Sequence, residues 1–275
     1  MFKHILVAHD LSREADIALH RAIQLARQHD ARLSVLHVLE DHLPNAVQNN
    51  LRDAAQQYFS EHLARQGVED CQLLLRKGRP AQHILEEMGD SQADLLVIGR
   101  HHHNAPELFI GTTLERVARH LSAPLLLVMG EQADKPYQKA AVALDFSLCA
   151  CDALRNACTL LPQDARLVAL NVMELGSRLL SKSGNSTDFL ATQRELLGKL
   201  LEDELSGLAG KIPTVELEVI RRGALPRALD EAVAEQRPQL LALGSHGRSL
   251  ISQALLGSLA LRYLQAPPCD LLLVK

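Results

Sequence analysis

The feature that most constrains the fold of this chain is a pattern that occurs twice along its 275 residues. Each copy begins with an apolar run that ends at an aspartate, Asp10 or Asp145, and a serine follows two residues later. Asp10 and Asp145 lie 135 residues apart, whereas Gly99 and Gly244, which end a later apolar run in each copy, lie 145 apart. A nearly constant offset with one step indicates a duplication, with an insertion around 176–187 that we interpret as a flexible loop.

Apolar runs of strand length alternate with stretches of helical periodicity in both copies. Such alternation is typical of a parallel β-sheet with helices on both of its faces. A chain of this length has room for about two domains. We therefore expect an N-terminal domain over 1–130, a polar linker over 131–138 and a C-terminal domain over 139–275. The expected strands of the first copy are 4–8, 33–38, 73–76, 94–99 and 124–128, and its expected helices are 13–29, 51–66, 81–89 and 112–121; in the second copy the expected strands include 140–145, 167–172, 240–244 and 268–274.

Composition argues against several classes of partner. A formal charge of −4 gives no general attraction to nucleic acids or anionic membranes, and 3% aromatic residues with no Trp leave few rings for stacking on single strands. No window approaches the roughly 18 consecutive apolar residues of a membrane span, and no signal-peptide cleavage site follows the first apolar run. Five cysteines, an odd number, favour a reduced compartment. We expect a cytoplasmic protein that binds neither nucleic acid nor membrane.

The second copy contains a loop suited to phosphate. The apolar run 240–244 ends at a glycine and leads through Ser245-His246-Gly247 toward Gly257-Ser258 and a helical stretch. Backbone N–H groups at a helix start attract anions, and glycines allow close approach of the backbone or a positive φ. The alternative is an ordinary strand-to-helix turn whose glycines only relieve steric crowding. Side chains that would add hydrogen bonds to a phosphate are Ser245, Arg248, Ser249 and Ser258.

Two copies of this pattern, with Gly244-x2-Gly247-x9-Gly257-Ser258 in the second, resemble the universal stress protein family in its tandem form. The resemblance covers essentially the whole chain and is most specific in that glycine signature, which is similar to the ATP-binding branch of the family. It implies an α/β fold of two Rossmann-like (adenine nucleotide α-hydrolase-like) domains, each a five-stranded parallel sheet in the order 3-2-1-4-5 with helices on both faces. It also implies that the halves pack through their last strands as a pseudo-dimer, and it leaves a further homodimer open.

The resemblance further implies a stress-response regulator or nucleotide-sensing switch that binds ATP or ADP, with or without Mg²⁺, in its C-terminal half. Asp145 would lie beside the adenine or ribose, Ala143 and Val172 would offer backbone groups to adenine, and the glycines would hold ribose and phosphates. This agrees with the rule that open parallel sheets bind ligands at the carboxyl ends of strands, where the strand order reverses. The expected nucleotide-binding residues are Ala143, Leu144, Asp145, Val172, Gly244, Ser245, His246, Gly247, Arg248, Gly257 and Ser258.

Other activities of the same fold are weighed against nucleotide binding. One alternative is a stress-response scaffold that acts through dimerisation and partner binding without nucleotide. Another is a slow ATPase, although no nucleophile, base or cluster of metal-binding carboxylates supports efficient turnover. We therefore assign no catalytic residue.

The first copy departs from the glycine signature. Gly99 is present, but His102 occupies the place of the second glycine, and Gly111-Thr112 comes one residue too early. The side chains of 101–104 crowd a loop where backbone would have to approach a phosphate. This half therefore retains at most a degenerate second site, which would consist of Asp10, Val38, Gly99, Gly111 and Thr112.

Two groups of residues invite a metal or redox interpretation that we do not adopt. Imidazole suits zinc, copper and nickel, but the adjacent His101, His102 and His103 do not easily converge on one ion, and we interpret them as a solvated loop. Cys151 and Cys158 are seven residues apart on one face of an expected helix, as in a buried apolar stripe. We expect both thiols in the core and no metal site.

Overall fold

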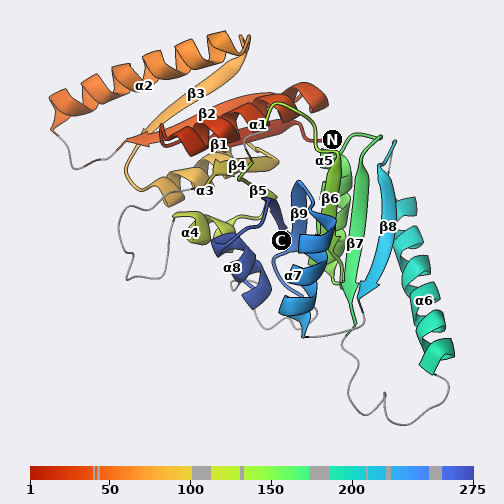
Figure 1. The fold of residues 1–275 in the computed structure, drawn as a ribbon. Coiled ribbons are helices and arrows are strands. Elements are labelled where there is room, and N and C mark those ends of the chain that lie inside the picture. Colours follow the sequence, from red (N-terminus) through yellow and green to blue (C-terminus); the bar gives the residue numbers. More distant parts are fainter. Residues whose placement is uncertain are drawn as a thin grey trace.

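The structure is a computed structural model, and strands and helices alternate through both copies as the periodicity predicts (Figure 1). It describes residues 1–39, 41, 44–100, 113–130, 133–173, 186–208, 210–220, 224–247 and 256–275, apart from the side chains of 186–190. The first half contains β1 (His4–Ala8), α1 (Arg13–His29), β2 (Arg32–Leu39), α2 (Asn45–Arg65), β3 (Cys71–Lys77), α3 (Pro80–Asp90), β4 (Leu95–Gly99), α4 (Thr113–His120) and β5 (Leu125–Val128). The second half contains β6 (Lys139–Ala143), α5 (Leu148–Leu160), β7 (Arg166–Val172), α6 (Ser186–Ser206), β8 (Thr214–Ile220), α7 (Leu225–Gln236), β9 (Leu240–Gly244), α8 (Ser258–Gln265) and β10 (Asp270–Val274).

The described strands form one continuous sheet in the order β3-β2-β1-β4-β5-β10-β9-β6-β7-β8. Within each half the strands are parallel and follow the order 3-2-1-4-5, so the fold class expected from the sequence is confirmed. The halves meet through their last strands, β5 and β10, which pair antiparallel with Leu126 opposite Leu272. Both residues are the second leucine of a Leu-Leu-Leu-Val run. Equivalent residues that pair with each other mark a pseudo-twofold axis, so the chain is a dimer within one polypeptide.

Two buried clusters, one on each face of the sheet, form the core. One includes residues of α1, α2, α5 and α6, such as Phe59; the other includes residues of α3, α4, α7 and α8, such as Leu229. Side chains of a strand alternate between the two faces, so β1 gives Val7 to the first cluster and Leu6 to the second. Because helices cover both faces, the strands have near-continuous apolar runs. None of the described helices combines the length and hydropathy that a membrane-spanning segment requires.

Most element boundaries lie within two residues of those expected from the sequence, and α2 is the exception. The sequence predicts a loop over 41–50 and a helix over 51–66, whereas α2 begins at Asn45, directly after Pro44. Proline is tolerated at a helix start, where no backbone N–H is needed inside the helix. The first turns of α2 are rich in polar residues and largely exposed to solvent. The polar composition of 45–50 therefore belongs to an exposed helix and not to a loop.

The two halves differ mainly in the connection between their second strand and second helix. α2 and α6 both contain 21 residues, but the connection from β7 to α6 is longer than that from β2 to α2. This extra length lies where the offsets predict an insertion. Most of the predicted insertion, 176–185, lies outside the described residues.

A buried polar cluster at Asp270 ties the inter-domain segment to both halves. Asp270, at the start of β10, is 2% exposed and accepts hydrogen bonds from the N–H groups of Met129 (2.7 Å) and Gly130 (2.9 Å) and from the hydroxyl of Tyr137 (2.5 Å). The guanidinium of Arg21 in α1 lies 3.9 Å from the centroid of the Tyr137 ring, and its Nε lies 3.7 Å from Oδ2 of Asp270. One carboxylate therefore contacts α1, the end of β5 and the segment leading to β6.

Candidate functional site

The candidate site lies at the carboxyl end of β6, where the strand order reverses. β6 has β7 on one side and β9 on the other. Its ladder with β7 ends at Ala143 and Leu170, whereas β7 continues to pair with β8 as far as Val172. β7 therefore extends beyond the end of β6, and the crevice rule for open parallel sheets points to this position.

The chain turns sharply where β6 leads into α5, and Asp145 holds this turn. Phe146 adopts a left-handed conformation with φ of 60°, and Ser147 caps α5 by accepting from the N–H of Ala150 at 3.4 Å. Oδ1 of Asp145 accepts from the N–H of Ser147 at 2.9 Å and from its hydroxyl at 2.6 Å. These bonds fix the orientation of the carboxylate.

The first half builds the same turn with its own residues. Leu11 has φ of 67°, Oδ1 of Asp10 accepts from the N–H of Ser12 at 3.0 Å, and Ser12 caps α1 by accepting from Ala15. The serine that follows the aspartate in both copies is thus a helix cap. The repeated Asp-x-Ser sequence is explained by this turn alone, without a ligand.

Gly247 brings the loop after β9 to this carboxylate. A Cβ placed on Gly247 would lie 3.0 Å from Oδ2 of Asp145. The hydroxyl of Ser147 also lies 3.5 Å from the carbonyl oxygen of His246. The structure therefore brings Asp145 and Gly247 together, and a side chain at position 247 would collide with the carboxylate.

Ser245 fixes both ends of the loop. It is 1% exposed; its N–H donates to Val274 at 2.6 Å, and its carbonyl accepts from the N–H of Gly257 at 2.9 Å. Its hydroxyl lies 2.8 Å from Nδ1 of His246. From the sequence we expect the Ser245 hydroxyl to hydrogen-bond a phosphate. In the structure this hydroxyl instead contacts the ring of His246.

Gly257 presents the start of α8 to the same region. It is the N-cap residue of α8 with no side-chain cap, and a Cβ there would lie 3.1 Å from the carbonyl oxygen of Ser245. Ser258 follows as the first helical residue and is exposed. A helix start without a capping side chain offers its N–H groups and the positive end of its dipole to an anion. Arg248 and Ser249, which belong to the expected site, lie outside the described residues.

Gly244 packs against the start of α5, and Gly99 packs against the start of α1 in the same way. A Cβ at Gly244 would lie 2.8 Å from the backbone N of Ala150, and one at Gly99 would lie 2.4 Å from the backbone O of Glu14. In each half the first turn of a helix therefore packs directly on the glycine that ends the fourth strand. Close packing is therefore sufficient to explain why glycine occupies positions 99 and 244. None of Gly244, Gly247 and Gly257 has a positive φ.

Backbone groups beside the site are held by a polar side chain that the sequence analysis missed. The N–H of Leu144 donates to Leu170 at 2.9 Å, and its carbonyl accepts from Nδ2 of Asn171 at 2.6 Å. In the first half, Nδ1 of His37 lies 2.8 Å from the carbonyl oxygen of His9 in the equivalent place. A lone polar residue near the end of an otherwise apolar strand is the signal that marks both positions.

His246 has a ring nitrogen directed into the protein. Its Nε2 is buried and has no hydrogen-bond partner among the described residues. Burial lowers the pKa of His246, and the charge of Lys275 lowers it further. The ring is thus held neutral at the base of the loop, with Nδ1 directed to Ser245.

The other residues singled out from the sequence are only partly described. Asp10, Val38 and Gly99 occupy the first-half positions equivalent to Asp145, Val172 and Gly244, whereas 101–104 and 111–112 lie outside the described residues. Within the described part of the chain, no group of three or more His, Cys, Asp or Glu side chains could hold a metal ion.

Cys151 and Cys158 lie in the core cluster beneath α5, as the helical spacing predicts. Burial raises the pKa of Cys151 to about 11 and that of Cys158 to about 12. Because the thiolate is the reactive form, both thiols are poor nucleophiles at neutral pH.

Comparisons with known proteins agree with this architecture. A sequence model of the universal stress protein family matches residues 1–129 and again 136–275. A protein named as a universal stress protein in Staphylococcus saprophyticus is 28% identical over 157 residues, which cover 53% of this chain and 94% of that protein. A Staphylococcus aureus protein of the same name is 30% identical over 151 residues, covering 50% of this chain and 90% of that protein.

Solved structures extend the likeness to the whole chain. A universal stress protein of Archaeoglobus fulgidus superposes with a TM-score of 0.70 over 99% of this chain and 98% of its own, at 17% identity. A Pseudomonas aeruginosa protein of unknown function superposes with a TM-score of 0.66 over 100% of this chain and 92% of its own, at 18% identity. At these identities the structural likeness shows the fold.

Proposed function

The chain belongs to the universal stress protein family and carries two domains of that family in tandem, and from this premise we propose that it binds an adenine nucleotide, ATP or ADP, in its C-terminal half. Binding would make the protein a nucleotide-sensing switch in a stress response. A ligand shifts a conformation or an assembly only if it binds the two states with different affinity. The contacts of the second half with β5, through β10, are the route by which such a shift would reach the first half.

The observation that carries the proposal is the close approach of Gly247 to the carboxylate of Asp145. Two segments that lie about a hundred residues apart meet there, and a Cβ at Gly247 would intrude on Oδ2 at 3.0 Å. A carboxylate held this way suits the hydroxyl groups of a ribose, which donate hydrogen bonds to it. The uncapped start of α8 at Gly257 suits the phosphates. The end of β7 at Val172 would supply backbone groups to the adenine.

The residues in the described part of the site favour binding over turnover. Asp145 is oriented by Ser147, and the thiols of α5 are buried in the core. Mg²⁺ would enter with the phosphates of the nucleotide, which are its usual ligands. The chemistry that this site performs is therefore recognition of an anion and a nucleoside by fixed backbone and one carboxylate.

Isothermal titration calorimetry with ATP and with ADP on the intact chain tests the proposal. The wild type is expected to bind one nucleotide per chain. Gly247→Val is expected to weaken binding by about 100-fold, because a side chain there fills the space beside Asp145 and a loss of about 3 kcal/mol corresponds to that factor. Gly89→Val is the matched control, since no atom lies within 4 Å of a Cβ at Gly89 in α3.

Each other outcome has a distinct meaning. Absence of binding heat at millimolar ATP and ADP, with a folded protein, contradicts the proposal. If the wild type and Gly247→Val bind nucleotide with equal affinity, the glycine loop is not part of the binding site. Two nucleotides per chain would assign the first half, with Asp10 and Val38, a site of its own.

A further inference from the structure

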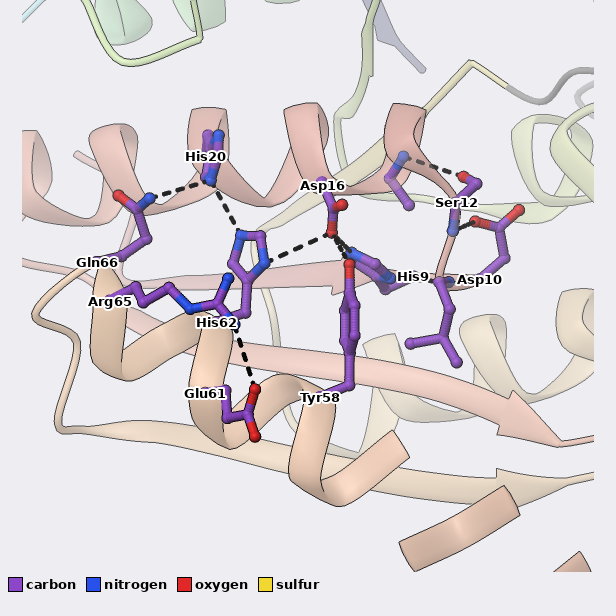
Figure 2. Close-up of polar contacts among 12 residues, drawn as sticks. His9, Asp10, Ser12, Asp16, His20, Tyr58, Glu61, His62, Arg65 and Gln66 are labelled. Atoms are coloured by element: carbon purple, nitrogen blue, oxygen red, sulfur yellow. Dashed lines mark hydrogen bonds and ion pairs between the residues drawn. The ribbon is translucent and has the colours of Figure 1, made fainter. Parts of the chain in front are cut away.

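A chain of hydrogen-bonding side chains joins α1 to α2 in the first half (Figure 2). Oδ1 of Asp16 in α1 accepts from the hydroxyl of Tyr58 and lies 3.2 Å from Nε2 of His9 and 3.8 Å from Nδ1 of His62. Nδ1 of His9 accepts from the N–H of Leu11 at 3.0 Å. Nε2 of His9 therefore carries the proton and donates to Asp16, so His9 is neutral.

The chain continues through a contact between two imidazole rings. Nε2 of His62 in α2 lies 3.0 Å from Nε2 of His20 in α1, and the side-chain amide of Gln66 lies 3.2 Å from the same His20 atom. Such a nitrogen pair is a hydrogen bond only while one nitrogen carries a proton and the other accepts it. One of the two ring nitrogens donates its N–H to the single lone pair of the other, and Nδ1 of His62 is on the side of Asp16.

The same contact cannot survive protonation of both rings. Two imidazolium rings would direct two N–H donors and two positive charges at each other across 3.0 Å. Nδ1 of His62 lies 3.8 Å from Oδ1 of Asp16, whereas His20 has no carboxylate at hydrogen-bonding distance among the described contacts and faces His62 directly. His20 is therefore the ring whose protonation breaks the contact.

The second half provides an internal comparison. Equivalent helices α5 and α6 are joined by Arg155, which stands where His20 stands in the first copy, and Nη2 of Arg155 lies 2.5 Å from Oε2 of Glu204. Arginine stays charged throughout the physiological range, so this contact does not depend on the titration of an imidazole ring. The second half thus joins its two helices through an ion pair, whereas the first half joins the equivalent helices through two histidines.

We propose that the contact between His20 and His62 is an acid-sensitive latch, which holds α2 against α1 near neutral pH and releases α2 when both rings are protonated. Charged and titratable groups face His20 from three directions: Asp16 on α1, His62 on α2 and Asp134 after β5. Burial lowers the pKa of His20 from its usual 6.5, the charge of His62 lowers it further, and the two aspartates oppose this. The closed latch therefore favours neutral His20, and opening becomes easier as the pH falls below about 6.5.

Hydrogen–deuterium exchange on the intact protein, read by mass spectrometry, tests the latch. Protection of 45–65 in α2 is compared with protection of 191–206 in α6 at pH 7.5 and pH 5.5, after correction for the intrinsic exchange rate. Uptake of one proton on opening raises the opening equilibrium by about tenfold for each pH unit below the usual histidine pKa. Protection of α2 is expected to fall by up to about tenfold relative to α6.

Variants separate the latch from general acid sensitivity. His20→Arg with His62→Glu copies the ion pair of the second half and is expected to abolish the relative loss of protection; His20→Gln with His62→Gln is a second, uncharged replacement with the same expectation. His120→Gln, which removes an exposed histidine of α4, should leave the acid response unchanged. An equal loss of protection in α2 and α6, or an unchanged acid response in both double variants, overturns the proposal. Neither result depends on whether the chain binds nucleotide.

Discussion

Asp10 and Asp145 make the same turn in the two copies, and this makes one a control for the other. Each accepts from the N–H of the serine two residues later, so loss of either carboxylate should cost similar stability. Asp145 lies beside Gly247 in the loop after β9, and in the sequence of the first copy His102 stands at the position that corresponds to Gly247. Comparison of Asp10 with Asp145 therefore distinguishes the structural role that both aspartates share from the proposed role of Asp145 in binding.

Asp145→Asn is expected to weaken ATP binding by about tenfold or more, since a hydrogen bond to a charged group contributes about 1.5–3 kcal/mol. Asp10→Asn should leave the affinity unchanged. Calorimetric titration of both variants measures this, with chemical denaturation to confirm comparable stability. Equal loss of affinity in the two variants would contradict the assignment of the site to the second half.

His9 gives the stability of the protein a pH dependence of predictable sign. Burial lowers the pKa of His9 from 6.5 to about 4, although the charges of Asp16 and Asp10 oppose this. Between these two values the unfolded chain binds a proton that the folded chain does not, so stability is complete above pH 6.5 and is lost as the pH falls toward 4. Urea denaturation should show a loss of up to about 3 kcal/mol from this group. His9→Gln should have a shallower dependence, and an identical pH profile for the variant would remove His9 as its source.

At the scale of elements, the close approach of α1 and α5 to the sheet depends on Gly99 and Gly244. Real Cβ atoms do not approach backbone atoms to the 2.4 Å and 2.8 Å found there, so an alanine must push the helix away. Gly99→Ala and Gly244→Ala should each lower the free energy of unfolding by about 1–3 kcal/mol, as overpacked substitutions do. Chemical denaturation measures the loss.

Gly198→Ala is the control for these substitutions. Gly198 lies inside α6 with no atom within 4 Å of an added Cβ. Alanine should raise the free energy of unfolding by about 0.5–1 kcal/mol, because it restricts the unfolded chain and favours a helix. If Gly99→Ala were as well tolerated as Gly198→Ala, the helix would have room to move and the packing argument would be wrong.

The sequence predicts most strands well because the apolar runs of the inner strands are buried on both faces and recur in two copies, and the resemblance to the family implies the order of the strands. It predicts the start of α2 poorly, since a helix end with exposed polar residues after Pro44 has the composition of a loop. At the candidate site, the offsets between the two copies identify Asp145 and the glycines as the residues that correspond to Asp10 and the loop after the fourth strand. The offsets do not reveal that the Ser245 hydroxyl contacts His246 or that Gly244 packs on α5. Both contacts depend on the three-dimensional packing around the loop, which the offsets do not describe.

At the scale of the whole molecule, the two halves are joined by a sheet interface and by the buried cluster at Asp270. Removing one partner of a buried ion pair typically costs about 3–5 kcal/mol, because a charge remains buried without compensation. Asp270→Asn is expected to lower the free energy of unfolding by about that amount, since it weakens contacts with Arg21, Tyr137 and the end of β5. Arg166→Ala breaks an exposed pair with Glu216 and should change stability by less than about 1 kcal/mol. Similar effects of the two substitutions in urea denaturation would show that the cluster does not hold the halves together.

The central claim is that the second copy, and not the first, holds an adenine nucleotide between Asp145 and the glycine loop. A crystal structure of the intact chain grown with ATP tests it most directly. We expect nucleotide density in the C-terminal half, with the ribose beside Asp145, the adenine near Val172 and the phosphates near Gly247 and the start of α8. Density confined to the first half, or side-chain atoms of the chain filling the space beside Gly247 in crystals saturated with ATP, would contradict it.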